Sequence, residues 1–277
     1  MRIPVTRPLF AWDCLEDSPS LQTVREFLEA LPDGKLLAAL RQWRGRGRDD
    51  YPVTALWGVC VLTPLLRHVS VEATLAELRR NQGLRRLIGI DSEANVPKKW
   101  NVSRFQKVLG QQPHLSLIRE IFDVMAGRLA EAVPALGERT AGDATGLSGR
   151  PQRSQGPHGD LDPPTGGRKE YLDEEGHVTK VVEWFGYKLH LLVDVEHEVA
   201  LGYRVSSANR GDNELLEELV KQARVNLGDD LEAQPPRSRI QTLAYDKAAD
   251  TEDVHELLHD SDIKPVVQMR SLWKGDL

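Results

Sequence analysis

Two aspartates, Asp143 and Asp246, have the residue type and surroundings that could support metal-dependent chemistry. Asp143 lies in the run TAGDATGL, whose small and apolar residues are typical of a buried or half-buried strand. Asp246 follows the short apolar run TLAY, at its carboxyl end. Because an unpaired buried charge is strongly unfavourable, a carboxylate in the position of Asp143 is expected to have a partner.

A divalent cation is the partner that both aspartates could share. Two adjacent carboxylates repel each other, and a cation between them allows both to ionise. Mg²⁺ or Mn²⁺ is expected, since both prefer oxygen ligands and can promote a displacement at a phosphodiester. The small neighbours Gly142 and Ala144 would let a phosphate backbone approach. In the alternative interpretation Asp143 ends a strand in a turn and Asp246 caps the following helix.

The elements that would position these aspartates change character near Pro134. Before it, apolar residues recur at helical spacing, which predicts an all-helical domain over residues 1–135. After it the order is strand, strand, strand, helix, strand, helix, strand, which predicts a mixed β-sheet domain over 136–277. Residues 148–182 are rich in Gly, Pro, Arg and Asp, and we expect a mobile loop there. In this order the first and fourth strands can be neighbours, which would bring Asp143 and Asp246 together.

The charge is unevenly distributed along the chain, whose formal net charge is −6. The C-terminal half is strongly acidic, so any phosphate binding should be led by the N-terminal half. Two residues of the hairpin GYKLHLL, Lys188 and His190, alternate with apolar residues and are expected to face outward. For Lys188, His190 and the basic residues of the N-terminal half, the alternative to DNA binding is a surface exposed to solvent. The basic residues expected to contact the DNA backbone are Arg79, Arg80, Arg85, Arg86, Lys98, Lys99, Arg104 and Lys107.

Several segments, taken in order, resemble one known family. The runs AGDATGL, GYKLHLLVD, SSANRGDNELL and YDKAAD look like the catalytic domain of the DDE transposases of bacterial and archaeal insertion sequences. The upstream helical runs, including VSRFQKVL, are similar to the N-terminal domain of the same transposases. This resemblance implies a ribonuclease H-like fold, double-stranded DNA as substrate (terminal repeats and target) and Asp143 and Asp246 as acidic metal ligands. It also implies Mg²⁺-dependent cleavage and strand transfer by a homo-oligomer or with a full-length partner.

The sequence departs from this family at the third acidic ligand, a glutamate on a helix after the last strand. The chain ends at Leu277 before such a helix. We therefore expect a partial ribonuclease H-like domain and a truncated transposase. The alternative to an active enzyme is a truncated transposase that is catalytically inactive and only binds DNA or an intact partner.

The run HELLH offers a remote alternative, because His255, Glu256 and His259 match the H-E-x-x-H pattern of zinc hydrolases. The two histidines would share a helix face, but a third ligand is not evident in the residues that follow. The first 20 residues lack the apolar segment of a secretory signal, and no apolar run is long enough to span a membrane. We expect a cytoplasmic, nucleoid-associated protein without a membrane partner.

Overall fold

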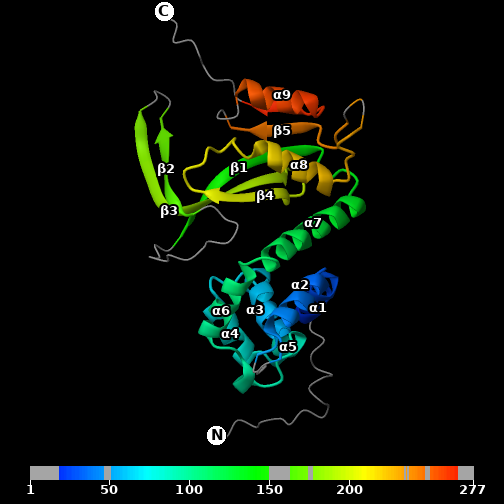
Figure 1. Cartoon of the computed structure of the whole chain (residues 1–277), viewed down its shortest axis with the longest axis vertical. Helices are drawn as coiled ribbons and strands as arrows, with labels where there is room; N and C mark the ends of the chain where they lie inside the picture. Colours follow the sequence, from blue (N-terminus) through cyan, green and yellow to red (C-terminus); the bar gives the residue numbers. More distant parts are fainter. Residues whose placement is uncertain are drawn as a thin grey trace, which may run out of the picture. The chain divides into compact units, whose positions relative to one another are not determined.

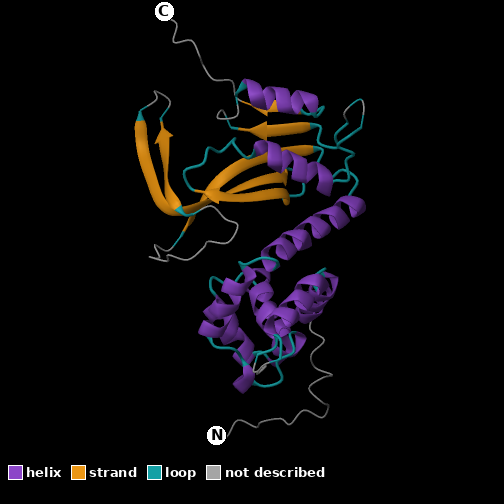
Figure 2. Ribbon diagram, in the orientation of Figure 1, coloured by secondary structure: helices purple, strands orange, loops and turns teal. Residues whose placement is uncertain are grey.

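The computed structural model describes residues 19–46, 51–149, 163–173, 177–233, 235, 237–246 and 250–267. The chain divides into two compact units, residues 1–121 and 122–277 (Figure 1). The described strands all belong to the second unit (Figure 2). The division falls inside the helix His114–Ala132, and the boundary drawn from the sequence after residue 135 follows the end of that helix.

The first unit is built around an apolar helix, α3 (Val53–Leu65), which contacts α2, α4 and α6. Leu62 of α3 is fully buried, as are Leu40 and Leu75 from neighbouring helices. Ser70 caps α4, since its hydroxyl accepts a hydrogen bond from the Ala73 amide at 3.2 Å. The other helical elements are α1 (Pro19–Ala30), α2 (Gly34–Arg44), α4 (Val71–Arg80), α5 (Gln82–Leu87), η2 (Glu93–Asn95), α6 (Lys99–Leu109) and the beginning of α7 (His114–Ala132).

The second unit is a mixed sheet with helices packed on it. Across the sheet the strands run in the order β4, β3, β1, β5, β6, and β2 pairs with the outer half of the long strand β3. Strand β1 is antiparallel to β3 and parallel to β5, so the predicted adjacency of the first and fourth expected strands is confirmed. The elements are β1 (Arg139–Ser148), β2 (Thr165–Leu172), β3 (Val178–Asp194), β4 (Val199–Ser207), α8 (Leu216–Asn226), β5 (Thr242–Tyr245), α9 (Glu252–Asp260) and β6 (Lys264–Val267).

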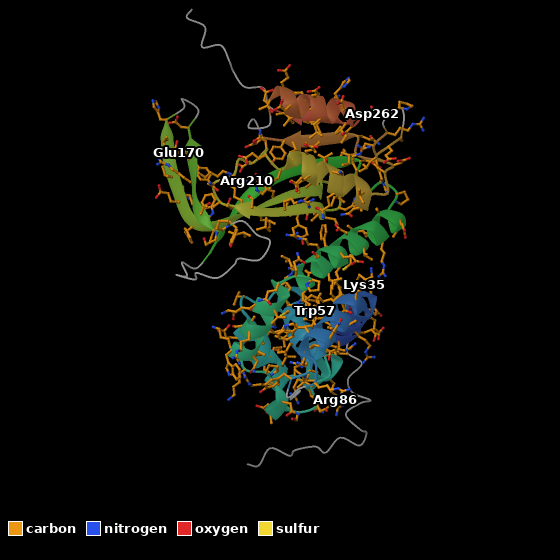
Figure 3. The ribbon with its side chains drawn as sticks, in the orientation of Figure 1. Lys35, Trp57, Arg86, Glu170, Arg210 and Asp262 are labelled. Atoms are coloured by element: carbon orange, nitrogen blue, oxygen red, sulfur yellow. The ribbon has the colours of Figure 1, made fainter. Side chains whose placement is uncertain are left out.

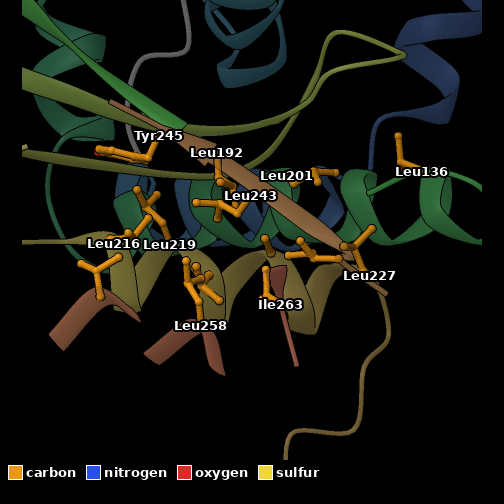
Figure 4. Close-up of a cluster of buried hydrophobic side chains, with 14 of the residues drawn as sticks. Leu136, Leu192, Leu201, Leu216, Leu219, Leu227, Leu243, Tyr245, Leu258 and Ile263 are labelled. Atoms are coloured by element: carbon orange, nitrogen blue, oxygen red, sulfur yellow. The ribbon is translucent and has the colours of Figure 1, made fainter. Parts of the chain in front are cut away.

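The core of the second unit lies between the sheet and helices α8 and α9. Leu192 of β3 and Leu243 of β5 face Leu216 and Leu219 of α8 and Leu258 of α9 (Figure 4). All five side chains are fully buried, which is the main source of stability expected for such a unit. The chain therefore has the predicted mixed α+β architecture, an all-helical unit followed by a unit built on a mixed β-sheet.

The prediction of a mobile loop over residues 148–182 is wrong for the residues that the structure describes in that interval. Strand β2 and the beginning of β3 form an antiparallel ribbon in that interval, while 150–162 and 174–176 lie outside the described residues. One of the glycines that suggested a loop, Gly167, has a packing role instead. A Cβ on Gly167 would lie 2.5 Å from the Trp184 ring, so this strand position has room only for glycine.

Candidate active site

Asp143 lies in β1, and Asp246 directly follows β5, the parallel neighbour of β1. The register pairs Ala141 of β1 with Ala244 of β5. Asp143 lies two residues after Ala141, and Asp246 lies two residues after Ala244. Side chains alternate between the two faces of a strand, so residues that are two positions apart point to the same face. The two carboxylates are therefore brought to the same edge, at the carboxyl end of β5.

Asp143 is exposed, which corrects the expectation of a buried or half-buried acid. Strand β5 ends at Tyr245 and pairs with β1 only as far as Ala141, so none of the described strands pairs with Asp143 on that side. Its Oδ1 accepts a hydrogen bond from the Ala144 amide at 2.7 Å. Asp246 is exposed as well. A shared cation is thus not needed to offset the cost of burying a charge. A cation from solvent can reach both carboxylates.

Tyr245 is a buried residue at the centre of this edge. Its hydroxyl donates to the Asp212 backbone carbonyl at 2.6 Å, and its ring lies over Gly142, where a Cβ would come within 2.4 Å. Burial raises the pKa of the Tyr245 phenol, and the negative charges of Asp212, Asp246 and Asp143 raise it further. The charges of three carboxylates therefore affect the pKa of one phenol. Asp212, in the turn before α8, thus belongs to the same edge of the sheet as the two predicted aspartates.

Asp212 is a residue of this edge that was not predicted from the sequence as part of a site. Its carboxylate accepts a hydrogen bond from Lys188 Nζ at 2.7 Å, and Lys188 also donates to the Arg210 carbonyl at 2.7 Å. The side chains of Lys188 and Asp212 are only 15% and 22% exposed. In Figure 3 the label on Arg210 marks this turn between β4 and α8. The run SSANRGDNELL predicts a turn at Asp212. Only the tertiary structure shows that Lys188 of β3 is the ionic partner of this aspartate.

A hollow of about 280 Å³ begins at Ala144, the residue after Asp143, and neither Asp143 nor Asp246 is among the described residues that line it. It is lined by residues of β1 from Ala144 onward, by the β2–β3 ribbon and by the Lys188–Asp212 pair. Arg168 and Lys169 of β2 place two further cations in its wall, with the Lys169 ammonium 5.9 Å from the centre of the Tyr171 ring. Lys188 is paired with Asp212 and Arg168 with Glu170, so Lys169 adds the positive charge of this wall that these two carboxylates do not balance, which favours an anionic ligand.

His190 is fully buried, so the prediction that it faces outward toward DNA is wrong. Its Nε2 lies 2.8 Å from the Ser206 hydroxyl of β4. Burial lowers the pKa of His190, and the backbone and charge of Asp212 oppose that shift. Lys188 shares the same strand face, and its ammonium is engaged by the turn before α8. Lys188 and His190 share the face of β3 that carries Leu192, so the face that alternation assigned to solvent is covered by α8 and the turn before it.

The predicted cations of the helical unit are exposed, with one exception. Arg85 is buried, and its Nη1 donates to the Leu78 and Arg79 carbonyls at 3.0 and 2.8 Å. It closes the carboxyl end of α4, so the prediction of a DNA contact is wrong for this residue. Arg86, labelled in Figure 3, is exposed on α5. Two of the others form ion pairs within the unit, Arg80 with Glu77 and Lys99 with Glu72.

The HELLH residues lie on α9 without a third donor among the described residues. His255 Nε2 lies 3.0 Å from Asp250, and His259 Nδ1 lies 3.4 Å from Asp260. His259 is 90% exposed in its side chain. In the described part of the chain no cluster of three or more His, Cys, Asp or Glu could hold a metal ion. The zinc-hydrolase alternative therefore gains no support from the structure.

The fold and the paired aspartates define a class, the DDE transposases, and two family models agree. Residues 137–275 match the family Transposase DDE domain, and residues 13–108 match Transposase domain (DUF772). The chain belongs to the DDE transposases of the insertion-sequence type. No curated protein matches it. No helix in the described ranges has the length and apolar character needed to cross a membrane.

Solved transposase structures also show similarity to this chain. A piggyBac transposase synaptic complex with hairpin DNA is 13% identical, with a TM-score of 0.36, over 86% of this chain and 46% of that one. A Mos1 strand transfer complex is 13% identical, with a TM-score of 0.27, over 81% of this chain and 60% of that one. A Mos1 mariner paired end complex with Mn is 11% identical, with a TM-score of 0.27, over 90% and 78%. The chain spans less than two thirds of the first two, and the family assignment rests on the family models.

Proposed function

We propose that this transposase cleaves DNA at the ends of its insertion sequence and transfers the freed strand, with Mg²⁺ or Mn²⁺ held by Asp143 and Asp246. The observation that carries the proposal is the register of β1 and β5, which brings Asp143 and Asp246 to the same edge of the sheet, next to a hollow that begins at Ala144. Carboxylate oxygens are the donors that these cations prefer, and both aspartates are exposed to receive one. When bound, the cation supplies charge stabilisation to oxygens at the reacting phosphorus.

The remaining residues of the site position the DNA strand. Arg168 and Lys169 offer positive charge to phosphates that enter the hollow, and Lys188 holds the turn that carries Asp212. In the first reaction, water attacks the phosphodiester in line and loses a proton to solvent, while the bond from phosphorus to the 3′ oxygen breaks and that oxygen takes up a proton from solvent. In the second reaction, the resulting 3′ hydroxyl attacks a target phosphodiester and loses its proton to solvent, while the target's own 3′ oxygen leaves and takes up a proton. Both are displacements at phosphorus, so one site serves both without a covalent enzyme intermediate.

Strand transfer must hold two DNA ends and a target together. We therefore propose that the chain acts as a homo-oligomer or with a full-length transposase partner. The exposed cations of the helical unit would bind the double-stranded terminal repeats through their phosphates. The proposed metal ligands are the two aspartates, because the register of β1 and β5 brings them to the same edge of the sheet.

The test measures nicking of a duplex that carries the element's own terminal repeats, with Mg²⁺ or Mn²⁺, beside Mn²⁺ affinity by calorimetry. Asp143→Asn and Asp246→Asn are each expected to lower nicking at least about 100-fold, because charge stabilisation at the reacting oxygens is lost. Each should also weaken Mn²⁺ binding. Asp260→Asn removes an exposed carboxylate from α9 in the same unit and should leave both measurements unchanged.

Nicking that survives Asp143→Asn would contradict the proposed catalytic site. Binding of the terminal repeats without metal-dependent nicking by the unaltered chain would favour the second candidate, a transposase that only binds DNA or an intact partner. Stoichiometric zinc that is lost in His255→Ala would instead support the zinc-hydrolase alternative.

A further inference from the structure

A second hollow, on the helical unit, combines aromatic rings with cations. It has a volume of about 420 Å³ and lies between α2, α3 and α6 and the segment at Tyr51. Trp43 and Trp100 are each 54% exposed, although large aromatic side chains are normally buried where packing allows. We call this hollow the tryptophan groove. None of the residues that form the proposed active site lines it.

The groove has an apolar floor and a positive rim. Leu56 and Phe105 belong to the buried core and form part of the floor. Arg104 and Lys107 project from successive turns of α6 at the rim, and the Arg104 guanidinium lies 5.4 Å from the centre of the Trp100 ring. No acidic side chain is among the described residues that line the groove. The complementary ligand is therefore flat, apolar on its faces and negatively charged at its edge.

We propose that the tryptophan groove binds an unpaired nucleotide of DNA, with the base against the indoles and the phosphate beside Arg104 and Lys107. This rests on the proposed function only in taking DNA as the substrate. A paired base in a duplex has its faces covered by its neighbours, so it presents no surface to an indole. An unpaired base can stack on an aromatic ring, and a nearby arginine adds to that attraction.

The test compares two labelled DNA molecules by fluorescence anisotropy with the full chain in EDTA. One is a blunt duplex, and the other is the same duplex with three unpaired nucleotides at one end. The unaltered chain is expected to bind the second about tenfold more tightly, the result of one stacked base. Trp100→Ala and Trp43→Ala should each reduce that preference and leave affinity for the blunt duplex unchanged. Trp100→Phe keeps a ring and should retain most of it.

A matched control is Phe185→Ala, which removes an exposed aromatic ring from β3, outside the groove. It should keep the full preference. The preference should also persist in Asp143→Asn with Asp246→Asn, which separates a failure of this proposal from a failure of the proposed catalytic site. Equal affinity for the two DNA molecules, or a preference that both tryptophan variants retain, would overturn the proposal. So would a shift of the tryptophan variants to a smaller oligomer with unchanged preference, since a second copy would then cover the groove.

Discussion

Single residues at the sheet edge show how few side chains define the site. Asp143 and Asp246 supply the carboxylates, and Gly142 leaves the space that the Tyr245 ring occupies. Tyr245 then fixes the turn at Asp212 through one hydrogen bond to its carbonyl. The site is therefore held by a buried phenol, whereas the groups proposed to bind metal are exposed to solvent.

A different aspartate, Asp194 at the end of β3, makes stability depend on pH. It is buried and accepts hydrogen bonds from the Gly137 amide at 2.7 Å and the His197 amide at 2.6 Å. Burial raises the pKa of Asp194, but these hydrogen bonds and the His197 side chain outweigh burial, so the pKa is lowered. The stabilisation is therefore present above the unfolded-chain pKa of about 3.9 and is lost as the pH falls through the folded-state pKa.

Asp194→Asn is expected to lower the free energy of unfolding by about 1–3 kcal/mol at pH 7, because buried donors lose a charged acceptor. The difference from the unaltered chain should shrink as the pH falls below about 4. Urea unfolding at a series of pH values measures both effects. A constant difference across that range would show that the carboxylate charge contributes nothing, and Asp260→Asn serves as the exposed control.

At the level of elements, the unequal lengths of β1 and β5 decide how the site is exposed. Strand β1 continues to Ser148, whereas its pairing with β5 ends at Ala141. The continuation of β1 beyond β5 carries Asp143 into the open and borders the hollow lined by β2 and β3. The register between β1 and β5 is therefore the feature that brings the two aspartates to the same edge of the sheet.

Gly142→Ala should disturb that register. The added methyl group would lie 2.4 Å from the Tyr245 ring, so the ring must move and its hydrogen bond to Asp212 must lengthen. We expect a loss of about 1–3 kcal/mol in the free energy of unfolding, as for other overpacked positions. Gly166→Ala is the matched control, since a methyl group on this glycine of β2 would meet no described atom within 4 Å. Equal losses in the two variants, measured by urea unfolding, would refute the packing role of Gly142.

For the whole molecule, the division of charge parallels the division into two units. Eight of the predicted DNA-binding residues belong to the helical unit and two, Lys188 and His190, to the other, in which residues 211–262 are rich in Asp and Glu. Phosphate contacts release counterions, so binding led by the helical unit should weaken with salt in proportion to the contacts made there.

A double variant, Arg79→Ala with Lys98→Ala, tests this division. Both side chains are exposed, and if each contacts one phosphate the slope of log affinity against log salt should fall by about 2 in magnitude. Lys221→Ala with Lys264→Ala removes two exposed cations from the acidic unit and should leave the slope unchanged. The measurement is duplex affinity at several salt concentrations. A larger effect from the second pair would place the duplex on the sheet unit.

The sequence by itself determined the helical and mixed-sheet units, the hairpin of β3 and β4, and the adjacency of β1 and β5. These follow from local periodicity and from the short list of ways in which such strands can pair. Only the tertiary structure decided that Asp143 is exposed, that His190 and Arg85 are buried, and that Asp212 approaches the site. Burial depends on which distant segment covers a residue, and no local pattern contains that information. The β2–β3 ribbon was missed for the same reason, since Gly167 of β2 is explained by the ring of Trp184 on the opposite strand.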